Sequence, residues 1–178
     1  DHYGQVTETS VVPFQPIAVS EADQRLAVPG DALTDTITVS SANGAWLKKD
    51  GAFIPVIFEG TAYQVPGTLP PAQDAVIEAA AVPLGTVTVT ADGPGVYTSP
   101  SVVAPSGGFV TWVWEMRKSS QPEWVRDYLA NDWQDDYGIN VVGDGAVIDR
   151  CVVRSSSIGI SVVGNDATIR KSSAQFVG

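Results

Sequence analysis

The stretch Leu33-Thr34-Asp35-Thr36-Ile37-Thr38-Val39 alternates apolar and polar residues. Alternation with a period of two is typical of a β-strand that has one buried face. The pattern returns in Gly85-Thr86-Val87-Thr88-Val89-Thr90, and turn residues such as Ala42-Asn43-Gly44 separate the strand-like runs. Short strands with turn signals roughly every 8–12 residues predict a mainly β protein built around an antiparallel, Ig-like β-sandwich.

The segment Phe109–Met116 is the most apolar of these predicted strands. Both of its faces carry bulky side chains, which is typical of a central strand that is covered on both sides. We expect Trp112 and Trp114 on opposite faces of this strand, with at least one of them in the core.

One short helix is predicted, over residues 121–132. Ser120 followed by Glu123 forms a capping-box pattern, and Pro122 suits the first turn of a helix. Large residues then recur at helical spacing, which favours packing in the core over a ligand-binding role. They are Trp124, Tyr128, Leu129 and Trp133.

Residues 139–178 carry a different signal, an internal repeat. The string Val141–Arg150 aligns with Val162–Lys171, which gives a period of about 21 residues, in the range of solenoid repeats. Glycine, asparagine and aspartate at fixed offsets between short apolar runs are typical of the rungs of a parallel β-helix. A hairpin extension of the sandwich is the alternative, and the sequence leaves both open.

A more widely spaced repeat indicates a module boundary. Asp1-His2-Tyr3-Gly4 is similar to Asp135-Asp136-Tyr137-Gly138, much further along the chain. We therefore expect a β-sandwich surface module at residues 1–138 and a β-helix-like repeat segment at residues 139–178. Repeats at two periods suggest part of a longer, modular and elongated protein.

The composition narrows the functional classes. Ten basic and twenty acidic residues among 178 give a net charge of −10, which repels phosphate backbones, so no nucleic-acid partner is expected. Cys151 and His2 are the only residues of their types, which excludes an intrachain disulfide, a Cys/His zinc site and a histidine-containing triad. No run approaches the ~18 apolar residues of a membrane helix, so we expect no membrane insertion in this segment.

Several strings between residues 1 and 138, in their order, resemble one protein family. They are Glu8–Pro16, Val28–Asp35, Gly93–Pro100, Trp112–Glu115 and Trp124–Leu129, the last running on to Trp133 and Asp135–Gly138. The chain resembles the tandem β-sandwich modules of large actinobacterial cell-surface proteins, which are wall-anchored and adhesin- or pilin-like. Residues after Gly138 are more similar to parallel β-helix regions of surface and phage-tail proteins. The resemblance implies a secreted chain that is extracellular or held in the cell wall.

The same resemblance implies that an internal crosslink is a candidate chemistry. Lys48 and Lys49 are available for an isopeptide bond, but both adjoin the turn dipeptide Asp50-Gly51, where a buried bond is not expected. The residues considered for an ester are Thr34 or Thr36 beside Asp35, with Gln5 or Gln134. The sequence fixes no pairing, and we assign no crosslink.

Two groups of acidic residues are further candidates. The group Asn131-Asp132 with Asp135-Asp136 has the oxygen ligands that calcium prefers, but a solvated helix end is the favoured interpretation. The acids available to a β-helix lyase or hydrolase are Asp144, Asp149 and Asp166. We favour a turn role for all three, and we interpret Cys151 as a small buried side chain.

We therefore predict a non-enzymatic stalk or adhesin module of a secreted or wall-attached bacterial surface protein. No catalytic, cofactor-binding or metal-binding residue is assigned, and no cofactor is expected. The expected partners are neighbouring modules of the same polypeptide, and host or cell-wall glycans or proteins. The alternative is a carbohydrate-binding or carbohydrate-processing β-helix protein of the surface or phage-tail type, in which the sandwich is an accessory domain.

Overall fold

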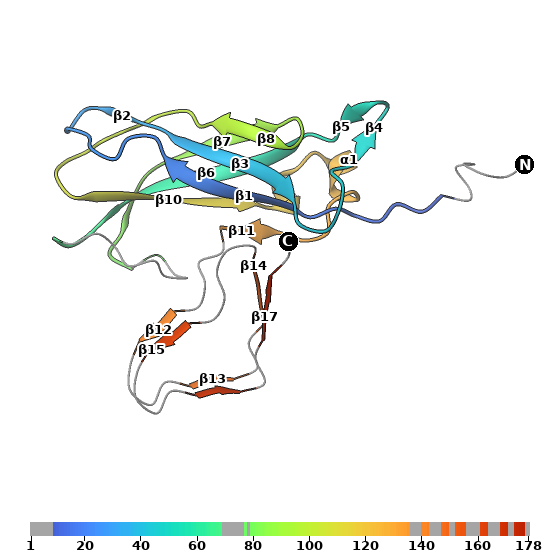
Figure 1. Cartoon of the computed structure of the whole chain (residues 1–178). Helices are drawn as coiled ribbons and strands as arrows, with labels where there is room; N and C mark the ends of the chain where they lie inside the picture. Colours follow the sequence, from blue (N-terminus) through green and yellow to red (C-terminus); the bar gives the residue numbers. More distant parts are fainter. Residues whose placement is uncertain are drawn as a thin grey trace, which may run out of the picture.

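A computed structural model describes residues 9–68, 77 and 79–135, together with the backbone of short strands between residues 140 and 176. Two antiparallel sheets face each other and form a β-sandwich (Figure 1). The predicted mainly β, antiparallel sandwich with one short helix is therefore confirmed. Its finer Ig-like assignment stays a prediction.

The two sheets differ in size. The first sheet has the order β1-β3-β8, with β1 at Pro16–Ala22, β3 at Asp35–Ser41 and β8 at Gly95–Thr98. The second sheet has the order β11-β10-β6-β7, with β11 at Trp133–Gln134, β10 at Phe109–Met116, β6 at Val56–Val65 and β7 at Val82–Ala91. Neighbouring strands are antiparallel in both sheets. Strand β10 lies between β11 and β6, as expected of a central strand.

Two short strand pairs mark the opposite ends of the sandwich (Figure 1). At one end, β4 (Lys48–Lys49) pairs with β5 (Ala52–Phe53). Their turn at Asp50-Gly51 has φ angles of 53° and 87°, the left-handed geometry that such turn dipeptides supply. At the other end, β2 (Ala32–Leu33) pairs with β9 (Val102–Val103). We call these the hairpin end and the far end.

The core lies between the two sheets, because inward residues alternate with exposed ones along the strands. In β3, Ile37 and Val39 are buried, while Thr38 between them is exposed. In β6, Val56, Phe58 and Ala62 all have no exposed surface. Burying one such aliphatic or aromatic side chain contributes roughly 1.5–3 kcal/mol, so this set is the main source of stability.

Trp114 lies at the centre of the core and is fully buried. Its ring lies against Gly60 of β6, where an added Cβ atom would come within 2.6 Å of the Trp114 Cε2 atom. Trp112 is also buried and stacks on Trp114, with ring centroids 6.2 Å apart. The expectation that at least one of these tryptophans lies in the core is confirmed. The expectation that they lie on opposite faces of the strand is wrong, because residues two apart on a strand share a face.

The helical segment is shorter than predicted. A 3₁₀ turn, η2, spans Lys118–Ser120, and the helix α1 spans only Glu123–Arg126. The residue before the helix is Pro122, and no side chain caps it. The predicted helix over 121–132 is therefore wrong in length, and the predicted Ser120 cap does not form.

Long-range hydrogen bonds explain the short helix. The Gln121 side chain is buried and bonds both backbone groups of Ile57, with Nε2–O and N–Oε1 distances of 2.8 Å. Past Arg126, the Tyr128 carbonyl accepts a hydrogen bond from the Phe14 amide at 2.9 Å. The Tyr128 carbonyl and the Ala130 amide, which a helix reaching residue 132 would use, are thereby bonded to Phe14 instead.

A ladder of parallel strand pairs follows the sandwich in sequence (Figure 1). The pairs are β12 (Asn140–Val142) with β15 (Ser161–Val163), β13 (Val147–Asp149) with β16 (Thr168–Arg170), and β14 (Val152–Ser155) with β17 (Ser173–Phe176). The separation in sequence is the same in every pair and equals the period of the repeat, so that Val141 pairs with Val162. Parallel pairing matches the predicted β-helix-like extension and excludes the hairpin alternative, whose strands would be antiparallel. The division at residue 138 stays a prediction.

Candidate functional site

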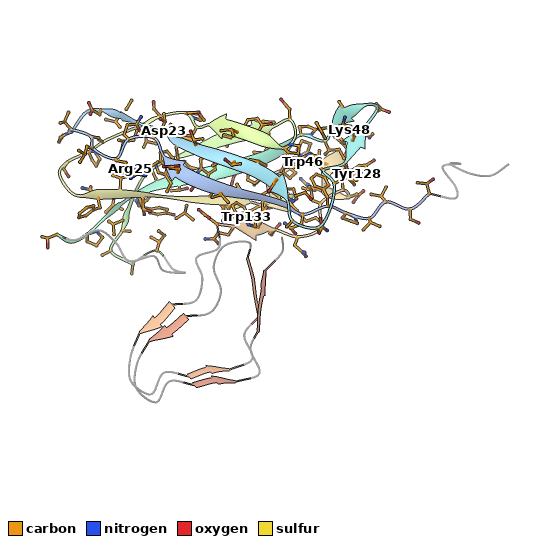
Figure 2. All side chains as sticks on the ribbon, viewed as in Figure 1. Asp23, Arg25, Trp46, Lys48, Tyr128 and Trp133 are labelled. Atoms are coloured by element: carbon orange, nitrogen blue, oxygen red, sulfur yellow. The ribbon has the colours of Figure 1, made fainter. Side chains whose placement is uncertain are left out.

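Aromatic rings and two lysines gather at the hairpin end, where Figure 2 labels Trp46, Lys48 and Tyr128. The Lys49 Nζ atom lies 4.7 Å from the Trp124 ring centroid and 6.0 Å from that of Tyr128. The Lys48 Nζ atom lies 4.4 Å from the Phe53 ring centroid. We call these five residues the hairpin-end cluster. Cations over ring faces attract the π electrons, but at an exposed site each contact is worth only ~0.5–1 kcal/mol.

The base of the hairpin is held rigidly under this cluster. Trp46 is buried, and its Nε1 atom donates a hydrogen bond to the Ile54 carbonyl at 2.8 Å. Its ring packs on Phe14 with centroids 5.1 Å apart. Gly93 has a φ of 136° and lies so close to Phe53 that a Cβ atom would be 2.6 Å from the ring. The two lysines are therefore presented by an ordered surface.

The hairpin-end cluster corrects one sequence interpretation. Trp124 was expected to pack in the core, but it is 44% exposed. Tyr128 and Trp133 pack partly against the core, and only Leu129 of the four large residues is fully buried. An exposed tryptophan beside a lysine offers a flat apolar ring and a charge, which is the kind of surface on which a sugar ring or an anionic group can bind.

A second polar site lies across β1 and β3, where an open hollow of about 570 Å³ is found. Asp23 at its rim accepts hydrogen bonds from Thr34 Oγ1 at 2.6 Å and from Thr36 Oγ1 at 2.7 Å. These two bonds hold the pKa of Asp23 below its usual value. The nearby Arg25 pairs with Glu21 at 3.3 Å, and Figure 2 labels Asp23 and Arg25 on this side of the molecule.

The residues considered for an ester crosslink have other partners in the structure. The Thr34 hydroxyl is paired with Asp23 rather than Asp35, and it also accepts a hydrogen bond from Gln24 Nε2 at 3.1 Å. Gln134 lies on β11, in register with Glu115. Thr34, the Asp23 carboxylate and the Gln24 amide therefore form a hydrogen-bonded group on the surface.

Asp35 is a buried acid that the sequence analysis did not single out in its own right. Its side chain is 1% exposed, and its Oδ2 atom accepts a hydrogen bond from Trp114 Nε1 at 2.6 Å. Burial raises the pKa of Asp35, and the bonds from Trp114 and Ser20 oppose that rise. The contact links β3 of the first sheet to β10 of the second. An acid at an inward position of an alternating strand was the signal that could have found it.

The acidic residues before the ladder act as hydrogen-bond acceptors. Asp132 Oδ1 accepts the Lys118 backbone amide at 2.7 Å, and Asp135 Oδ2 accepts the Ser20 hydroxyl at 3.5 Å. Within the described side chains, no group of three or more acids, histidines or cysteines is placed to hold a metal ion. Other candidate residues lie outside the described side chains, namely Gln5, Asp136, Asp144, Asp149, Cys151 and Asp166.

The comparisons with known proteins give no assignment. No family model matches the chain, and neither a curated protein nor a solved structure matches it significantly. Among the described residues, no helix is long and apolar enough to cross a membrane. Any function must therefore be argued from the surfaces and contacts described above.

Proposed function

We propose that this chain is a non-enzymatic structural module, a spacer or adhesin stalk, of a secreted or wall-attached bacterial surface protein. The observation that supports this proposal is where the exposed apolar side chains lie. Among the described residues, ten large apolar side chains are exposed, and all but Val19 and Val96 lie at the two ends of the sandwich. Exposed apolar surface that recurs at both ends suits contact with a preceding and a following module.

The far end carries the more exposed set. Leu26 is 96% exposed, and the others, Val28, Val82 and Val103, are 55% to 65% exposed. These residues come from the loop after β1, the start of β7 and the end of β9. The hairpin end carries Val11, Val12, Phe53 and Trp124. Covering such surface stabilises a contact by ~25 cal/mol per Å² of apolar area.

A second candidate function is a carbohydrate-binding or carbohydrate-processing β-helix protein that carries the sandwich as an accessory domain. Two observations favour it. The parallel ladder, with the same sequence separation in every pair, has the geometry of stacked solenoid rungs. The exposed ring of Trp124, beside Lys49, is a surface on which a sugar can stack.

Surface location is the first test of the proposed stalk. Antibodies raised against the recombinant chain should label intact cells of the organism that encodes it, and protease added to intact cells should remove the label. A cytosolic protein serves as the protected control. Label found only after the cells are broken open would overturn the proposal.

Polysaccharide binding separates the two functions. The full chain is run in native gels with and without wall polysaccharides of several compositions. A spacer should migrate equally in all gels. Retardation that Trp124→Ala abolishes, and that the far-end change Val103→Ser leaves intact, would support the carbohydrate-binding function instead.

A further inference from the structure

The first and last described segments of the sandwich lie side by side and run in the same direction. Phe14 and Leu129 form a parallel bridge. The Phe14 amide donates to the Tyr128 carbonyl, and the Ala130 amide donates to the Phe14 carbonyl, both at 2.9 Å. Residues near the two ends of the sandwich sequence are therefore joined directly by backbone hydrogen bonds.

The Gln15 side chain extends this pairing by one step. Its Oε1 atom accepts the Asn131 amide at 3.1 Å, and its Nε2 atom donates to the Asn131 carbonyl at 3.4 Å. The side-chain amide thus bonds the same two groups that a neighbouring strand would bond. We call Phe14, Gln15, Tyr128, Ala130 and Asn131 the terminal clamp.

The terminal clamp rests on the core. Phe14 is 2% exposed and packs on Trp46, while Leu129 has no exposed surface. Beyond the clamp the two segments stay close, because the Ser20 hydroxyl donates to Asp135 at 3.5 Å. Both segments therefore run parallel from the hairpin end toward the far end (Figure 1).

We propose that the terminal clamp bears the load when this chain is stretched. Tension pulls the chain before Phe14 one way along the strand axis and the chain after Asp135 the opposite way. Because the two segments are parallel and hydrogen-bonded, these forces slide one past the other. The hydrogen bonds that run across from one segment to the other are then loaded together, whereas antiparallel strands pulled from one end would open one bond at a time.

The neighbouring pairings oppose the same displacement. Strand β1 cannot slide without also shearing its seven residue pairs with β3, from Pro16–Ser41 to Ala22–Asp35. On the other side, β11 is held to β10 by the pairs Glu115–Gln134 and Met116–Trp133. The clamp thus transmits force into both sheets at once. This inference rests on the proposed stalk function, for which resistance to tension is a physical requirement.

The test is single-molecule force spectroscopy on the full chain, held at its two termini. The sandwich should unfold in one step, with a contour gain of roughly 400 Å for residues 14–135. Gln15→Ala should lower the unfolding force and speed unfolding at constant force by roughly fivefold, because forced unfolding is governed by the unfolding barrier. The matched control is Gln64→Ala, which removes contacts to Ser106 and Gly107 at the far end.

The outcomes separate this inference from the proposed function. A drop in force for Gln15→Ala that Gln64→Ala does not share supports the clamp. Equal forces for the two variants, with equal stabilities in chemical denaturation, would overturn it. Surface labelling of intact cells is independent of these forces, so a failed clamp leaves the surface assignment standing, and failed labelling leaves the mechanical result standing.

Discussion

The sandwich and the ladder of this chain use hydrogen-bonded strands in opposite ways. In the sandwich, the separation in sequence between paired residues varies from pair to pair, as for Trp114 with Gly60 or Ile37 with Tyr97. In the ladder, every pair has the same separation in sequence. The sandwich therefore depends on one shared core, whereas a ladder is stabilised step by step by its nearest neighbours.

This difference has an energetic consequence. Ordering one residue's backbone costs ~1–2 kcal/mol, which a core must offset by burial. The sandwich does so with two sheets that cover each other. A parallel solenoid needs at least about three stacked repeats before it is stable by itself. The described strands of the ladder make a single step, in which each strand has one partner.

The largest expected effect breaks the shared core. Trp114→Ala should cost about 3–5 kcal/mol, since it empties the centre of the core and removes the indole hydrogen bond to the Asp35 carboxyl. The matched control is Trp124→Ala, at a ring that is 44% exposed, which should cost less than about 1 kcal/mol. Urea denaturation measures both. Equal losses would show that the core is not centred on Trp114.

The next effect comes from the contact of β6 with β10. Gly60→Ala should cost about 1–3 kcal/mol, because its Cβ atom would lie 2.6 Å from a buried indole ring. Gly107→Ala is the control, since nothing lies within 4 Å of its added Cβ. We expect the control to be neutral in thermal denaturation. A neutral Gly60→Ala would mean that the two strands can separate without loss, contrary to a single close-packed core.

The sequence predicts the two regions with different success, for a physical reason. The ladder spacing is readable because the repeat that aligns Val141 with Val162 shows directly which residues pair. The alternation in Leu33–Val39 likewise predicts a strand, because burial on one face imposes a period of two. The helix over 121–132 was wrong, because Phe14, from the opposite end of the sandwich sequence, takes the Tyr128 carbonyl and Ala130 amide. No local pattern contains that pairing.

The candidate site shows the same limit. The Asp50-Gly51 turn and the exposed position of Lys48 and Lys49 follow from local sequence. The exposure of Trp124 does not follow from local sequence, because its spacing from Tyr128 is typical of core residues on one helix face. The observed helix ends at Arg126, before Tyr128, so that helical spacing does not apply. The clamp residue Gln15 carries no sequence signal, because its role depends on Asn131 lying beside it.

A smaller effect should appear as a pH dependence of the sandwich. Burial raises the pKa of Asp35 above its unfolded value. The folded state therefore binds the Asp35 proton more tightly than the unfolded state does. The stabilisation that protonated Asp35 adds to the free energy of unfolding is fully present below the unfolded pKa, and it is lost as pH rises through the folded pKa. Asp35→Asn can still accept the Trp114 hydrogen bond and carries no charge to bury.

The expected result for Asp35→Asn is near-equal stability to the natural chain in acid. At neutral pH the variant should be equal or more stable, by less than about 1.5 kcal/mol. Urea midpoints of both chains across this pH range measure the difference. The opposite result would be a variant that matches the natural chain in acid but is less stable than it at neutral pH. That result would mean that the Asp35 charge stabilises the fold. Asp23, the other nearby acid, is unchanged in both chains.

The smallest expected effect tests the comparison itself, by removing the ladder. Among the described residues, the strands of the two sandwich sheets pair only with strands between Pro16 and Gln134, and the buried core residues lie between Phe14 and Leu129. Deleting residues 141–178 should therefore leave a folded, monomeric fragment with the same urea midpoint and the same near-ultraviolet dichroism as the full chain. Of the described strand pairs, the deletion removes only the parallel ones, and none of these joins a sandwich strand. The fragment could instead be unfolded, or its β10 and β11 amides could exchange much faster than in the full chain. Either result would show that the ladder supplies part of the sandwich. The contrast between a shared core and a stepwise ladder would then not hold for this chain.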